Sequence, residues 1–114
     1  MPRYTKKLEF TKRERERIKA RDKGCIFCRL NYHMEERKDT YMSQQIQIMH
    51  YIPRSKQGLG IAENGACGCM WHHEMLDNGN KGRREEMLEL FRNYLRAHYD
   101  DWNGEDLIYK KYDF

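Results

Sequence analysis

The sequence predicts a small α+β domain held together by a metal ion. The chain has 114 residues and 35% of them are charged, so its apolar core is thin. Two pairs of metal-binding residue types, Cys25-x-x-Cys28 and Cys69-x-x-His72, lie far apart in the chain, and this spacing lets both members of a pair reach one ion. Between them, residues 45–48 alternate polar and apolar side chains, as a half-buried strand does.

The first helix and the strand can be placed from local signals. Thr11 and Glu14 have the spacing of a capping box, in which each side chain accepts a hydrogen bond from the other residue's amide. The helix that begins there is expected to end near Asp22, before Gly24. The strand leads directly into His50, and the following Pro53 limits further pairing.

Two more helices are predicted after the strand. Residues 70–77 form a short helix that Asn78 and Gly79 close. Residues 83–98 repeat apolar residues at helical spacing, with acidic residues early and basic residues late, as the helix dipole prefers. We interpret its apolar face as a lid over the core of one domain, residues 1–114.

The cysteines favour a structural zinc site. C-x-x-C spacing without a secretion signal favours thiolates on a metal over disulfides. Cys25, Cys28, Cys69 and His72 would make a tetrahedral set that closes a long loop. A site that uses Cys67 in place of His72 is the alternative, but C-x-C chelation of one zinc is strained, so we favour His72.

The remaining histidines are candidates for chemistry. His50 ends the strand, where an imidazole could take a proton from water. His73 and Asp77 lie four residues apart on a helix and share a face, which suits a divalent cation between them. Arg54 is positioned to bind a phosphate, although an exposed surface arginine is the equal interpretation.

Taken together, these residues resemble the HNH endonuclease family, most of all the short HNH proteins of phages and prophages. The match runs over residues 25–79 and consists of Cys25-x-x-Cys28, the run His50-Tyr-Ile-Pro-Arg-Ser with a following Gly-Leu-Gly, Asn64, and Cys-x-x-His-His. The resemblance implies a zinc-stapled ββα-metal (His-Me finger) core, at about residues 25–79, with flanking N-terminal and C-terminal helices.

The resemblance also implies roles for individual residues. His50 would be the general base, Asn64 would orient the base and its loop, and His73 would ligate a catalytic magnesium or manganese ion. Asp77 stands where relatives often carry another metal ligand. The activity implied is metal-dependent hydrolysis of DNA phosphodiester bonds.

One position departs from the family pattern. HNH proteins usually carry Asp or His immediately before the base, where it binds the metal, and this chain has Met49. A thioether is a poor ligand for a hard cation. The alternative function is therefore a catalytically lapsed, zinc-stabilised DNA-binding module.

Charge and hydropathy bound the partners and the compartment. Lys and Arg exceed Asp and Glu by four, which fits a polyanionic partner such as DNA. The resemblance adds a second copy of the chain, or phage packaging or restriction proteins, as further partners. No segment approaches the roughly 20 apolar residues that span a bilayer. We expect a cytoplasmic protein with no membrane partner.

Overall fold

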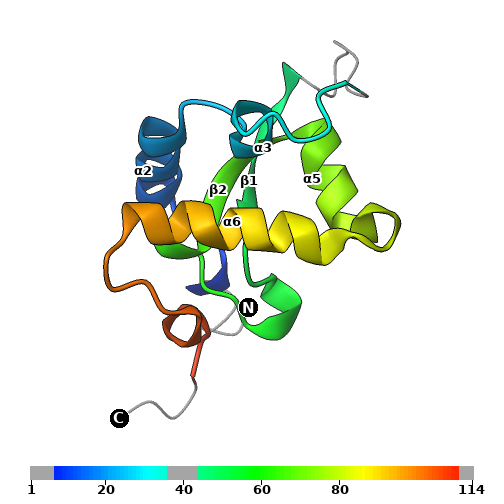
Figure 1. Ribbon diagram of the computed structural model, residues 1–114. Helices are drawn as coiled ribbons and strands as arrows, with labels where there is room; N and C mark the ends of the chain where they lie inside the picture. The colour runs from blue at the N-terminus through cyan, green and yellow to red at the C-terminus, as the bar shows by residue number, and fades with distance from the viewer. Residues whose placement is uncertain (1–6, 36–43, 111–114) are drawn as a thin grey trace.

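The computed structural model describes residues 7–35 and 44–110 (Figure 1). Helices and strands follow in the order α2 (Lys12–Asp22), α3 (Ile26–Arg29), β1 (Ile46–His50), β2 (Gly65–Cys69), α5 (Met70–Asp77) and α6 (Arg84–His98). Short 3₁₀ turns lie at η1 (Arg54–Lys56), η2 (Ala62–Asn64), η3 (Gly79–Gly82) and η4 (Gly104–Leu107). This mixture confirms the predicted α+β class. No helix in the described ranges has the length and apolar character needed to cross a membrane.

The predicted bounds of the helices agree with the structure, but the capping box is only half formed. The Thr11 hydroxyl accepts from the Glu14 amide at 3.2 Å, as predicted. The Glu14 carboxylate instead accepts from the amide of Ala62 at 2.9 Å. The reason is tertiary: η2 lies against α2 and presents an amide that needs an acceptor. The left-handed residue that ends α2 is Lys23, at φ 55°, rather than Gly24.

The two strands form an antiparallel pair in which Ile46 lies opposite Cys69 and His50 opposite Gly65. Residue propensity alone does not predict β2, because glycine is disfavoured in strands. Its glycines are required by close packing: a Cβ on Gly68 would lie 2.4 Å from the sulfur of Met49. Every residue of β2 is buried.

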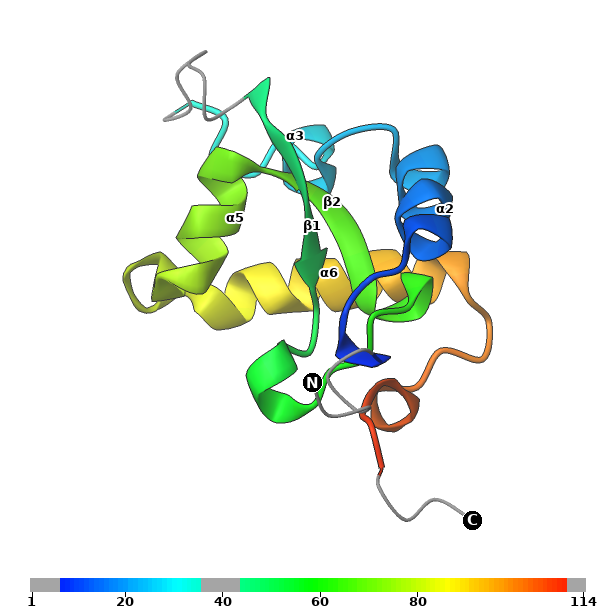
Figure 2. The ribbon, with the colours of Figure 1, turned by 180° about the vertical axis from the view of Figure 1, so that it is seen from behind.

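Each face of the strand pair packs against different elements. Helix α6 crosses one face (Figure 1), where Met49 of β1 is buried in one core cluster with Met87, Phe91 and Leu95. The N-terminal segment and α2 lie toward the other face (Figure 2), where Ile18 belongs to a second cluster. Helix α5 follows β2 without a break, so the strand, strand, helix order of the predicted core is present.

A buried carboxylate joins three of these elements. Asp22, at the end of α2, is fully buried and accepts from the Tyr94 hydroxyl of α6 at 2.6 Å and from the amide of Cys67 in β2 at 2.8 Å. The neighbouring Arg21 guanidinium pairs with the same carboxylate and donates to the carbonyls of Ala62 and Gly65. Burial raises the pKa of Tyr94 to about 12, and the hydrogen bond from the Tyr94 hydroxyl to Asp22 is a smaller cause of the same rise.

Candidate functional site

Two helix N-termini bring the predicted zinc ligands together. Cys25 caps α3, where its sulfur accepts from the amide of Cys28, and Cys69 caps α5, where its sulfur accepts from the amide of His72. One ligand atom from each of these four residues lies within 4.8 Å of all the others. Each pair, Cys25 with Cys28 and Cys69 with His72, spans the first turn of a helix, so both side chains of a pair point toward the same place.

The distances in this cluster fit a tetrahedral zinc ion. Nδ1 of His72 lies 3.5 Å from the sulfurs of Cys25 and Cys28 and 3.3 Å from that of Cys69. The sulfurs of Cys28 and Cys69 are 3.8 Å apart. Zinc with bonds of about 2.3 Å to sulfur and 2.0 Å to nitrogen requires edges of about 3.8 and 3.6 Å. Nε2 of His72 donates to the Tyr32 carbonyl at 2.8 Å, which leaves Nδ1 free as a ligand.

The protonation of the cluster also suits a metal. A hydrogen bond from the Cys25 thiol lowers the pKa of Cys69 to about 3, and the same bond, with burial, raises the pKa of Cys25. A metal ion binds thiolates, so its binding would displace the thiol protons of this cluster. All four cysteines are free of disulfides. The residues present fit zinc, and three thiolates with one imidazole form a closed structural site.

Cys67 lies outside this cluster. It is buried in the second core cluster with Phe10, Ile18 and Ala62. Burial raises the pKa of its thiol, which favours the protonated form over the thiolate that binds a metal. The structure thus brings His72, and not Cys67, to the other three ligands.

His50 is held by the N-terminal segment. Its Nε2 donates to the backbone carbonyl of Leu8 at 2.8 Å, and its ring centroid lies 4.3 Å from that of Phe10. This tautomer leaves Nδ1 as a proton acceptor. Burial lowers the pKa of His50, and the charges of Arg54 and His73 lower it further. The hydrogen bond to Leu8 raises this pKa, but the net lowering favours the uncharged imidazole.

His73 lies on the first turns of α5 and is oriented from both sides. Its Nδ1 contacts Oε1 of Gln47 in β1 at 2.7 Å, and its Nε2 lies 3.4 Å from a carboxylate oxygen of Asp77. Since the amide oxygen is an acceptor, Nδ1 carries the proton and Nε2 is free to bind a cation beside Asp77. Sequence reasoning missed Gln47, because a polar residue in an alternating strand reads as a solvent-facing position.

Asn64 positions the loop that follows His50. It is fully buried, and its side chain accepts from the Ile52 amide at 2.8 Å and donates to the carbonyls of Ile52 and Leu59. Its own carbonyl accepts from the amide of Tyr51. All of these contacts go to the backbone, so Asn64 holds the loop and reaches His50 only through it.

Arg54 and Met49 complete the set of predicted positions. Arg54 is exposed, and its guanidinium lies 3.4 Å from a carboxylate oxygen of Glu9. Met49 is wholly buried in the core beneath α6. The residue that departs from the HNH pattern is therefore a packing residue, and its side chain lies on the opposite face of β1 from that of His50.

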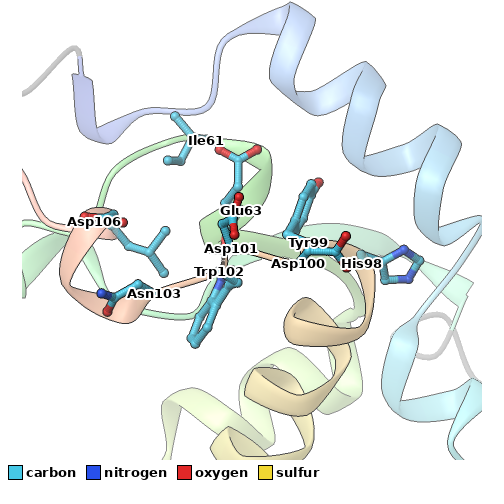
Figure 3. A pocket seen from close by; sticks show the side chains of 10 residues that line it. Ile61, Glu63, His98, Tyr99, Asp100, Asp101, Trp102, Asn103 and Asp106 are labelled. Atoms are coloured by element: carbon cyan, nitrogen blue, oxygen red, sulfur yellow. Dashed lines mark hydrogen bonds between the residues drawn. The ribbon is translucent and has the colours of Figure 1, made fainter.

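A cavity of about 540 Å³ (Figure 3) lies away from these residues. It is formed where the end of α6 meets the segment that follows and the η2 turn. Four carboxylates line it, those of Glu63, Asp100, Asp101 and Asp106, and none of the predicted site residues does. Its charge is unsuited to a nucleic acid backbone.

Comparison with known proteins does not identify a family for this chain. No protein-family model matches the chain, and neither does any curated protein or solved structure.

Proposed function

We propose that this protein is an HNH-type endonuclease that hydrolyses DNA phosphodiester bonds, with His50 as general base and one divalent ion held on α5. One observation carries the proposal. Each of the two histidines has one ring nitrogen hydrogen-bonded to a protein oxygen, so that among the described residues Nδ1 of His50 has no hydrogen-bond partner and Nε2 of His73 faces only the Asp77 carboxylate, at 3.4 Å. A free nitrogen on each ring is what a base and a metal ligand require.

The residues would divide the work as follows. Nδ1 of His50 takes a proton from a water molecule, whose oxygen attacks phosphorus as the bond to the 3′-oxygen breaks. A magnesium or manganese ion on His73 and Asp77 would neutralise charge on the phosphate and the leaving oxygen. Asn64 keeps the loop after His50 in place, and Arg54 is available to bind a phosphate oxygen. The products are a 5′-phosphate and a 3′-hydroxyl.

The test is nicking of supercoiled plasmid by zinc-loaded protein in magnesium or manganese. We expect His50→Ala to reduce the rate at least 100-fold, because general base catalysis contributes about 10²–10⁴. His98→Ala is the matched control, since His98 is an exposed histidine at the end of α6. Equal rates for His50→Ala and the unmodified protein would show that His50 is not the base.

A lapsed DNA-binding module is the second candidate. In the part of the chain that the structure describes, the zinc ligands form the sole group of three or more converging His, Cys, Asp or Glu side chains. His73 and Asp77 thus supply two donors to a second ion, and water and phosphate would supply the rest. Salt-sensitive DNA binding without nicking in magnesium, manganese, nickel or zinc would favour this candidate.

A further inference from the structure

A groove of about 500 Å³ lies between α6, the loop that follows β1, and residues 102–108. It is separate from the zinc cluster, although Tyr51 in its wall directly follows His50 in the chain. Figure 1 shows the backbone of the segments that line it, which are helix α6 at the centre, the green turn of η1 below it and the orange-to-red segment after α6. Its lining combines basic side chains with aromatic rings.

Four cations line the groove. Arg84, Arg92 and Arg96 lie on one stripe of α6, and Lys56 faces them from η1. Residues four apart on a helix rise by about 6 Å, so Arg92 and Arg96 present charges at regular intervals along the groove. The carboxylates in the lining are those of Glu85 and Glu105. Among the described residues, no carboxylate oxygen lies within 4 Å of the charged groups of these four cations.

The three arginines are held differently, and Nε of Arg84 donates to the Leu76 carbonyl at 3.1 Å. Nε of Arg92 is buried and has no acceptor among the described residues, which is rare for a buried donor. The guanidinium of Arg96 lies over the ring of Trp102, 5.7 Å from its centroid, which holds the charge at the groove.

Aromatic and apolar side chains also line the groove. The rings of Tyr51 and Trp102 contact each other edge to face, with centroids 5.6 Å apart, and both line the groove. Ile108, 37% exposed, and Leu88 also line it. Cations along a groove with aromatic rings in it are the features that bind single-stranded nucleic acid, with phosphates on the cations and bases on the rings.

We propose that this groove binds a single strand of nucleic acid through its phosphodiester backbone. The inference rests on the proposed function for one point, that the bound strand is DNA positioned beside the loop that follows His50. The neighbouring acidic cavity shares Trp102 and Asn103 with the groove. Its four carboxylates repel phosphate, so the strand is confined to the basic side of Trp102.

The test measures binding of a fluorescein-labelled ten-nucleotide oligothymidylate to zinc-loaded protein by anisotropy at several salt concentrations. A hairpin duplex with the same number of phosphates is the second probe. The test variant is Arg92→Gln with Arg96→Gln. The matched control is Lys12→Gln with Arg13→Gln, which removes the same charge from exposed positions on α2.

We expect the groove variant to bind the single strand at least tenfold more weakly. The slope of its log affinity against log salt concentration should be smaller in magnitude by about 1.4, because two phosphate contacts are lost and each contributes roughly 0.7. The control should change binding less than threefold. In a Trp71→Phe background, where Trp102 is the remaining tryptophan, the single strand should quench its fluorescence.

Three outcomes overturn the inference: equal losses for both variants, equal affinity for the duplex, or no quenching of Trp102. Nicking is scored separately. Binding in the groove without nicking would defeat the endonuclease proposal and leave the groove standing. If the groove variant nicked DNA with an unchanged KM, the groove proposal would fail and the endonuclease proposal would stand.

Discussion

Gln47 and His73 are joined across the β1–α5 interface by a 2.7 Å contact between Oε1 and Nδ1. This contact determines which nitrogen of His73 faces Asp77. In metal sites such an outer partner fixes the tautomer and the ring orientation of the ligand, and its loss typically weakens metal binding 10- to 100-fold.

Gln47→Leu should therefore raise the manganese concentration that gives half-maximal activity by about 10- to 100-fold. The zinc content should stay at one ion per chain, because Gln47 does not contact the cluster. Gln44→Leu, an exposed glutamine nearby, is the control. A metal titration of both variants checks this, and an unchanged midpoint for Gln47→Leu would remove Gln47 from the site.

The zinc cluster should dominate the stability of the fold. Structural zinc contributes about 10–16 kcal/mol in small zinc domains, which is comparable to the whole free energy of unfolding of a domain this size. Cys69→Ser should lose zinc and its cooperative thermal transition. Cys67→Ala should keep one zinc and lose only about 1 kcal/mol of packing. Elemental analysis and calorimetry would expose an error in the ligand set if Cys67→Ala lost the metal.

The environment of His50 sets the expected pH dependence. Burial lowers the pKa of His50 from 6.5, so the folded protein holds it neutral at pH values where the unfolded chain is protonated. Activity that depends on neutral His50 should therefore persist below pH 6.5. Above pH 6.5 His50 is neutral in both states, so it should not change the free energy of unfolding there. As the pH falls from 6.5 to the lower pKa of the folded state, the unfolded chain takes up the proton first and the free energy of unfolding should decrease.

Phe10 offers a direct test of that cause. Phe10→Ala removes the ring that covers His50, so the pKa of His50 should rise toward 6.5. Titration of the histidine resonances by NMR measures the change, with exposed His98 as the internal control. A pKa of His50 that did not move would mean that Phe10 does not contribute to its desolvation.

Met49→Asp should not create a metal ligand. The side chain of Met49 is fully buried beneath α6, so a carboxylate there would lie unpaired in the core. We expect a loss of roughly 3–5 kcal/mol in the free energy of unfolding, against less than about 1.5 kcal/mol for Met49→Leu. Urea denaturation measures both. A stable Met49→Asp protein with increased nicking would show that residue 49 can turn toward the site.

Asp22→Asn should uncouple α2 from α6. The buried Arg21 would lose its counter-charge, which we expect to cost about 3–5 kcal/mol. Burial, the larger cause, would still hold the pKa of Tyr94 above 10, but that pKa should fall below about 12 because the charged acceptor of its hydroxyl is removed. Absorbance titration of tyrosine detects this, and Asp100→Asn is an exposed control.

The sequence by itself determined helices α2, α5 and α6 and the residues of the metal-binding cluster, but not the short helix α3. The bounds of α2, α5 and α6 and the set Cys25, Cys28, Cys69 and His72 follow from capping signals, apolar periodicity and chelate spacing. Each of these signals depends on residues only a few positions apart in the sequence, so it can be recognised without knowing which distant residues come into contact.

The tertiary structure decided the rest. It made a strand of the glycine-rich segment 65–69, buried Met49, and gave both histidines their hydrogen-bond partners. Leu8 lies 42 residues from His50 in the chain and Gln47 lies 26 residues from His73. Tautomers and burial depend on which distant atoms come within about 3 Å, and local patterns in a sequence carry no information about such contacts.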